Sequence, residues 1–153
     1  MERANEIFID HCKPVNLAKF AGNGCVIEEQ NERALAFTTV DLAKIKLMPT
    51  FSHWQRNVTG EENLRNMEEA NYILLGFNFF QYFWEYQHII PETWKEKVKS
   101  RNRHIYFPGS VIKLADDSRC ILGMLFYCGR WSHTKRKLTD YWYEDHCSAV
   151  LEV

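Results

Sequence analysis

The sequence has few residues that interrupt regular structure and no apolar run long enough to cross a membrane. Only seven glycines and four prolines occur among 153 residues, so most of the chain is free to form helices and strands. A membrane helix needs about 20 consecutive apolar residues, which this sequence does not offer. The first residues also lack a basic region followed by an apolar stretch. We therefore expect no secretory signal, no membrane partner and a cytoplasmic protein.

The cysteines are too few and too irregularly spaced to predict a disulfide framework. Five are present, an odd number, and no C-x-x-C pair occurs. Two of them belong to a repeated tripeptide, Asp10-His11-Cys12 and Asp145-His146-Cys147, whose histidines and cysteines together match a common zinc ligand set. Chance is enough to explain a repeated tripeptide in a chain of this length. We therefore predict reduced cysteines, no metal site and no cofactor.

The sequence also lacks the short motifs of the common enzyme classes. It contains no glycine-rich phosphate loop, no H-E-x-x-H zinc motif and no G-x-S-x-G nucleophile motif. The six histidines are scattered, and His146 is the one that follows two carboxylates, Glu144 and Asp145, which could tune it as a general base. We predict no catalytic residues and keep an enzyme of unknown class as an alternative.

Aromatic residues are what the sequence has in excess. Five Trp, seven Tyr and ten Phe make up 14% of the chain, which is 46% hydrophobic and 25% charged overall. These overall proportions are those of a soluble globular domain, and the length suits one such domain over residues 1–153. Because each ring buries a large area, we expect a core built on aromatic side chains.

Local patterns predict two or three helices. Thr59-Gly60-Glu61-Glu62 is a capping box, which begins a helix that ends near Asn71. A second helix begins at Asn78 and places aromatic rings at i,i+4 spacing on one face, which favours packing against a sheet. A second cap of the same kind, Thr93-Trp94-Lys95-Glu96, begins a short third helix.

The remaining patterns predict an antiparallel sheet and, with the helices, an α+β fold. Residues 25–27 and 34–37 flank a polar tip and predict an N-terminal hairpin, and residues 43–47 alternate like a half-buried strand. From His104 onward the pattern predicts a meander of about four antiparallel strands. Residues 120–128 form an almost continuous apolar run, which places them in the centre of the sheet.

The stretch from Trp84 to Lys97 has a distinctive pattern, in which an aromatic helix runs into Ile90-Pro91-Glu92-Thr93-Trp94-Lys95. It resembles a family of small, uncharacterised bacterial proteins, in which an Ile-Pro-Glu-x-Trp-Lys segment joins such a helix to a β meander. The resemblance covers residues 41–151, with further matching segments at Asp41–Ile45, Thr59–Glu62, Phe107–Ser110, Gly129–Trp131, Trp142 and Ser148–Leu151. Between Trp131 and Trp142 this chain is more basic and polar than the family pattern. The resemblance implies a shared fold and no established activity.

Positive charge is concentrated late in the chain. Residues 1–92 have a formal charge of −5 and residues 93–153 a formal charge of +4, which gives a net charge of −1. Two basic and aromatic segments, 94–107 and a loop at 130–137, account for most of this charge. They supply the candidate binding residues Trp94, Lys95, Lys97, Lys99, Arg101, Arg103, Arg130, Trp131, Lys135, Arg136 and Lys137. Because cations neutralise phosphates and rings stack on bases, these segments indicate single-stranded RNA or DNA as a partner. Solvation of a loop and a helix end is the simpler explanation of the same charges.

Binding of another protein is the function that the sequence favours most. So many aromatic residues are hard to bury completely, and exposed Trp, Tyr and Arg side chains are typical anchors of protein interfaces. Trp54, Trp131 and Trp142, each next to polar sequence, are the candidate anchors. We therefore predict a non-catalytic macromolecular-interaction module whose partner is another protein. Single-stranded nucleic acid is the alternative partner.

Overall fold

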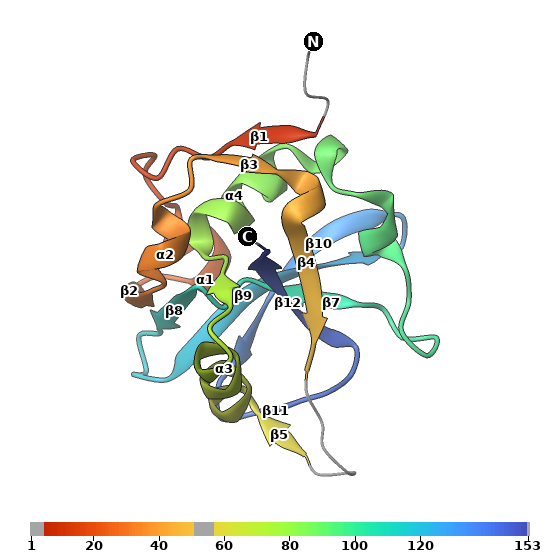
Figure 1. Cartoon of the computed structure of the whole chain (residues 1–153). Helices are drawn as coiled ribbons and strands as arrows, with labels where there is room; N and C mark the ends of the chain where they lie inside the picture. Colours follow the sequence, from red (N-terminus) through yellow and green to blue (C-terminus); the bar gives the residue numbers. More distant parts are fainter. Residues whose placement is uncertain (1–4, 51–56, 153) are drawn as a thin grey trace.

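A broad sheet occupies the middle of the molecule, and helices α3 and α4 lie on opposite sides of it (Figure 1). The structure is a computed structural model that describes residues 5–50 and 57–152. In chain order its elements are β1 (Glu6–Phe8), α1 (Leu17–Ala21), β2 (Val26–Gln30), α2 (Glu32–Leu35), β3 (Thr39–Asp41), η1 (Leu42–Lys44), β4 (Ile45–Pro49), β5 (Val58–Thr59), α3 (Gly60–Glu69), β6 (Ile73–Leu74), α4 (Phe77–Glu85), η2 (Gln87–Ile89), η3 (Glu92–Lys95), β7 (His104–Tyr106), β8 (Ser110–Lys113), β9 (Arg119–Tyr127), β10 (Arg130–Lys137), β11 (Tyr141–Trp142) and β12 (His146–Leu151). The mixed α and β composition confirms the predicted class.

The main sheet is larger than the predicted meander of about four strands. It contains eight of the described strands in the order β2-β8-β9-β7-β12-β4, with β10 paired to β9 and β6 paired to β12. The difference arises because β2, β4 and β6 from the first half of the chain join the strands that follow His104. The sheet is also not wholly antiparallel, since β7 and β12 run parallel. The predicted centre is confirmed, because β9 pairs with β7, β8 and β10.

The predicted N-terminal hairpin is wrong. β2 pairs with β8, and Ala34 lies in α2 rather than in a strand. The side chain of Asn31 caps α2, because its Oδ1 accepts a hydrogen bond from the Ala34 amide at 3.1 Å. An Asn cap of this kind offers the backbone a local alternative to a hairpin turn. The strand predicted at 43–47 is also shifted, because η1 takes residues 42–44 and β4 begins at Ile45.

Two of the three predicted helices are confirmed close to their expected starts. α3 begins at Gly60, and Thr59 Oγ1 accepts a hydrogen bond from the Glu62 amide at 3.2 Å, as a capping box requires. α4 begins at Phe77, one residue before the predicted start. The third is only the 3-10 turn η3, which begins after Pro91 and has no side-chain cap. Within the described ranges, no helix is long and apolar enough to cross a membrane.

Aromatic rings fill the space between the sheet and α4, as the sequence predicts. Phe80 and Phe83 of α4 meet Phe107 with ring centroids 5.7 and 6.1 Å apart. A second, smaller core lies on the other face, where Trp142 and Leu64 of α3 pack in one cluster. The middle of the sheet is therefore covered on both sides, whereas residues 127–130 at the tip of the β9–β10 hairpin are all exposed.

The cysteines are expected to separate into reactive and protected groups. All five are free; Cys12 and Cys128 are exposed, whereas Cys120 and Cys147 are buried. Burial raises the pKa of Cys120 to about 11, and the thiolate is the form that reacts. A short iodoacetamide pulse at about pH 8 should therefore modify the exposed pair and spare the buried pair until the protein unfolds. Peptide mass spectrometry with and without urea measures this, and equal rates at Cys12 and Cys120 in the native protein would contradict it.

Candidate functional site

The second basic segment is a strand and not the loop that the sequence predicts. β10 pairs with β9 from Arg130 to Lys137, so its side chains alternate between the two faces of the sheet. Lys135 lies on the face of α1, where its Nζ donates a hydrogen bond to the Ala21 carbonyl oxygen at 3.1 Å. Arg136 therefore lies on the opposite face. The pairing thus separates cations that stand side by side in the sequence.

Two further candidate residues of that segment, besides Lys135, lie on the α1 face and are engaged there. Trp131 is buried and stacks edge-on against Phe126, with ring centroids 5.4 Å apart. Lys137 forms an ion pair with Asp116 at 3.8 Å. Both side chains therefore make their contacts within the protein.

Much of the first basic segment is also held against the protein. Trp94 is buried in the aromatic core. Lys95 Nζ forms an ion pair with Glu92 at 3.0 Å, and Arg103 Nη1 donates a hydrogen bond to the Thr93 carbonyl oxygen at 3.2 Å. These contacts stabilise the η3 turn. The charges of Lys95 and Arg103 therefore have a structural role.

Three cations of the first segment have exposed side chains. Lys99 is one of them, and its Nζ is paired with Glu144 at 2.6 Å. The other two, Lys97 and Arg101, lie on either side of the short turn closed by the Val98–Arg101 bridge. Arg101 is close enough to His146 to affect its titration, so this turn adjoins the start of β12.

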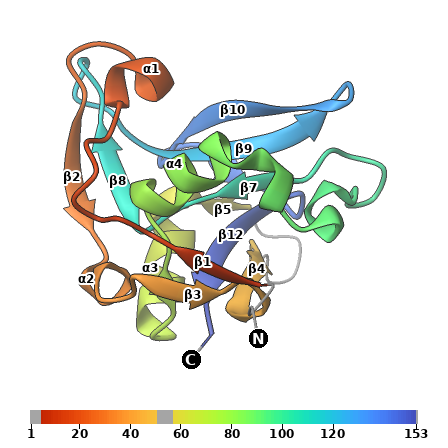
Figure 2. The ribbon, with the colours of Figure 1, turned by 90° about the horizontal axis from the view of Figure 1, so that it is seen from above.

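One face of the β7–β9–β10 sheet gathers partly exposed side chains, which we call the open face. Cross-strand partners share a face, and so do residues two apart along a strand. The open face consists of His104 on β7, Leu125 and Tyr127 on β9, and Arg130, Ser132, Thr134 and Arg136 on β10. Figure 2 shows the β9–β10 hairpin reaching out past α4. The hairpin therefore presents cations, hydroxyls and rings to the outside.

Arg136 contacts two exposed tyrosines at the edge of the open face. The Arg136 Nε donates a hydrogen bond to the Tyr141 carbonyl oxygen at 3.1 Å. Its guanidinium carbon also lies 5.8 Å from the centroid of the Tyr143 ring, which is a cation–π contact. The Tyr141 and Tyr143 side chains are 48% and 44% exposed. Arg136 therefore holds its charge against the exposed ring of Tyr143 and the backbone of Tyr141.

A histidine cluster borders the open face where β7 and β12 begin. The parallel register pairs His104 with His146, and their ring centroids are 5.0 Å apart. Asp145 joins them, with its Oδ2 3.7 Å from His104 Nδ1. The His104 amide also donates a hydrogen bond to the Asp145 carbonyl oxygen at 2.7 Å, which fixes the two residues relative to each other.

Burial keeps both histidines of the cluster neutral. It lowers the pKa of His104, and it lowers the pKa of His146 to about 4. The nearby charge of Arg136 acts in the same direction, and the Asp145 carboxylate opposes it without reversing it. Both imidazoles are therefore uncharged near neutral pH, the state in which a ring nitrogen keeps a lone pair for a proton or an ion.

Tyr106 is buried beside the histidine cluster, on the same face of the sheet as His104. Its hydroxyl shares a hydrogen bond with Thr134, and burial raises its pKa to about 12. The ring crosses β9 at Gly123, where a Cβ would lie 2.6 Å from the Tyr106 ring. Glycine at this position therefore gives the tyrosine the room it needs.

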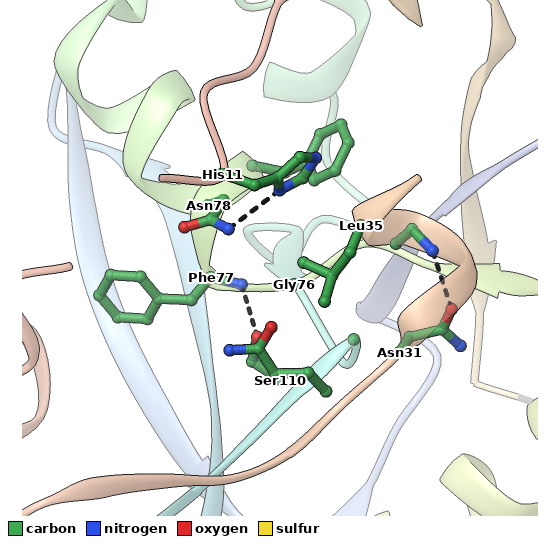
Figure 3. A pocket seen from close by; sticks show the side chains of 11 residues that line it. His11, Asn31, Leu35, Gly76, Phe77, Asn78 and Ser110 are labelled. Carbon is green, nitrogen blue, oxygen red and sulfur yellow. Dashed lines mark hydrogen bonds between the residues drawn. The ribbon is translucent and has the colours of Figure 1, made fainter. Parts of the chain in front are cut away.

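A small pocket lies at the start of α4 (Figure 3). His11 Nε2 donates a hydrogen bond to the Phe37 carbonyl oxygen at 2.7 Å, and Asn78 Nδ2 donates one to His11 Nδ1 at 3.0 Å. Ser110 Oγ accepts a hydrogen bond from the Phe77 amide at 2.8 Å. Each of these hydrogen bonds is made within the protein, so the polar groups named here join the N-terminal segment and β8 to the start of α4.

The repeated tripeptides do not form the joint zinc site that their composition suggests. His11 makes its contacts with Phe37, Asn78 and the ring of Phe79, whereas His146 packs against His104. The residue that the sequence did not connect with Asp145-His146 is His104. Its signal was weak, because a single histidine at the end of a basic segment looks like part of a solvated loop.

The function of this chain has to be argued from its own residues. No family model, curated protein or solved structure matches it. The resemblance of residues 41–151 to small bacterial proteins therefore stays a prediction. The features with chemistry of their own are the open face and the histidine cluster.

Proposed function

We propose that the protein is a binding module that takes single-stranded nucleic acid across the open face. The observation that supports this most directly is the position of Arg136 beside the exposed ring of Tyr143 and the backbone of Tyr141. A strand of nucleic acid offers phosphates for the cation and bases for the rings. An antiparallel sheet with exposed rings is a known platform for single strands.

The charge of the open face favours a polyanion over a protein partner. Arg130 and Arg136 lie on it with two hydroxyl residues, and its seven members include no carboxylate. Along β10 these two arginines frame Ser132 and Thr134, which are suited to hydrogen bonds with phosphate or sugar oxygens. Cations spaced along a strand in this way follow a nucleic-acid backbone.

Two of the three tryptophans that favoured a protein partner in the sequence are not exposed as anchors would be. Trp131 and Trp142 are buried, 7% and 2% exposed, and Trp54 lies outside the described residues. Trp131 packs in the aromatic core and Trp142 in the second core. Each therefore contributes to one of the two cores.

Two charge reversals at neighbouring positions of β10 test the proposal. Arg136→Glu should weaken the binding of labelled single-stranded RNA about tenfold and lower its log–log salt slope by about 1, because one phosphate contact is lost. Lys137→Glu changes the net charge equally, but Lys137 lies on the opposite face and should leave affinity nearly unchanged. Fluorescence anisotropy between low and physiological salt measures both. Arg130→Glu, at the exposed hairpin turn, is the second variant in case Arg136 is needed for folding.

The result that would overturn the proposal is equal weakening by both reversals, since that would report net charge alone. Absence of binding at low salt would also overturn it, because electrostatic attraction is strongest there. A protein partner would then be the next hypothesis to test.

A further inference from the structure

Three side chains of the histidine cluster bring potential metal-ligand atoms close together. One nitrogen of His104, one nitrogen of His146 and one carboxylate oxygen of Asp145 all lie within 4.8 Å of one another. His104 Nδ1 is inaccessible to solvent and has no hydrogen-bond partner among the described residues. The Asp145 side chain is 11% exposed, and its Oδ2 lies 3.7 Å from that same nitrogen. A ring nitrogen and a carboxylate that lie together away from solvent can share one cation.

We propose that His104, Asp145 and His146 bind one divalent transition-metal ion, such as Zn²⁺ or Co²⁺. Two imidazoles and one carboxylate are a ligand set that suits these ions better than Mg²⁺ or Ca²⁺, which prefer oxygen. Three protein ligands leave one position of a tetrahedral ion for solvent. The His104 side chain is 27% exposed, so solvent lies next to the site. The site does not depend on nucleic-acid binding at the open face.

The backbone already holds the three residues close to the required spacing. The parallel pairing of β7 and β12 sets His104 beside His146, and the His104 amide is bonded to the Asp145 carbonyl oxygen at 2.7 Å. Ligand atoms around a tetrahedral zinc ion are about 3.3 Å apart. The longest gap must therefore close by about 1.5 Å, a movement that rotation of the partly exposed His104 ring can supply.

Metal binding should break one hydrogen bond of His146, whichever of its two ring nitrogens holds the ion. In the structure, the Tyr143 amide donates a hydrogen bond to His146 Nδ1 at 2.9 Å. An ion at Nδ1 would replace that amide. An ion at Nε2 would move the proton of the neutral ring to Nδ1, which could then no longer accept. The Tyr143 amide should therefore lose its partner whenever the site is filled.

Two nearby cations weaken the site without removing it. Arg136 and Arg101 lie close enough to disfavour positive charge at His146, and they act on a metal ion in the same way. The Asp145 carboxylate, in direct reach of the ion, offsets them. Neutralising that carboxylate should therefore have a large effect on affinity.

The test is a calorimetric titration of chelator-treated protein with Zn²⁺. The wild-type chain should bind one ion, and His104→Gln and Asp145→Asn should each lower the affinity more than about tenfold, because each removes a ligand. His88→Gln is the matched control, since His88 is exposed in η2 and lies outside the cluster. Co²⁺ absorption in the visible range reports nitrogen and oxygen ligands directly.

A second measurement on the wild-type chain keeps the proposal falsifiable if a variant fails to fold. The Tyr143 amide resonance should shift, and its hydrogen exchange should accelerate, on addition of Zn²⁺. An unmoved Tyr143 amide would overturn the proposal, as would a chain that binds no Zn²⁺. Equal loss of affinity in His88→Gln, or unchanged affinity in both cluster variants, would show adventitious binding only and would overturn it as well.

Discussion

Replacing Gly109 by alanine is expected to destabilise the protein severely. A Cβ at this position would lie 2.2 Å from the Leu74 carbonyl oxygen and 2.6 Å from the Gly76 amide nitrogen. Both are backbone atoms, so neither can swing aside as a side chain would. The approach is held by two hydrogen bonds: the Gly109 amide donates to the Leu75 carbonyl oxygen at 2.8 Å, and the Asn31 amide donates to the Gly109 carbonyl oxygen at 2.6 Å. We expect a loss of more than about 3 kcal/mol in the free energy of unfolding.

Gly129→Ala is the control that separates this clash from the general cost of replacing a glycine. Gly129 has a φ of +77°, and nothing lies within 4 Å of the position of its Cβ. Alanine there should cost only the backbone strain, about 1 kcal/mol. Urea denaturation followed by circular dichroism compares the two variants. Similar stabilities for Gly109→Ala and Gly129→Ala would show that the backbone around Gly109 can move apart.

Phe80→Ala is expected to have the second large effect, about 4 kcal/mol of stability. Phe80 has no exposed surface and packs edge-on against Phe20, with ring centroids 4.8 Å apart. It also meets Phe107 at 5.7 Å and stacks on Trp84 at 6.5 Å. Truncation removes these ring contacts and leaves a cavity that three rigid neighbours cannot fill.

The same truncation at Phe8 is the matched control. Phe8 lies in β1 and is 64% exposed, so Phe8→Ala should change the free energy of unfolding by less than about 1 kcal/mol. The difference in urea midpoint between the two variants, at equal slope, measures the contribution of the aromatic core. Equal midpoints would mean that the rings between α4 and the sheet do not hold the fold together.

Local signals in the sequence are enough to predict three elements of the fold. The α3 start follows from Thr59 and Glu62, which are three residues apart, and the aromatic side of α4 follows from helical spacing. The central place of β9 follows from its own apolar run. Each of these features depends on contacts within one or two turns or within one strand. Interactions within a short stretch of sequence are therefore enough to specify these features.

Tertiary structure alone decided which strands pair and which face each side chain occupies. Asn31 ends β2 with a helix cap, so β2 finds its partner in β8, far along the chain. The pairing of β10 with β9 sets the Arg136 side chain on the open face and that of Lys137 on the other. No local rule in the sequence fixes such a register, because it depends on the other strands of the sheet.

The candidate sites belong to this second class. His104 meets Asp145 and His146 because β7 and β12 pair in parallel, a pairing between distant segments. Burial beside Trp142 and Tyr106 then removes water from these groups and lowers the pKa of His146. The residue types were visible in the sequence. Their proximity and their desolvation arise only in the folded protein, because both depend on all the elements that pack around the cluster.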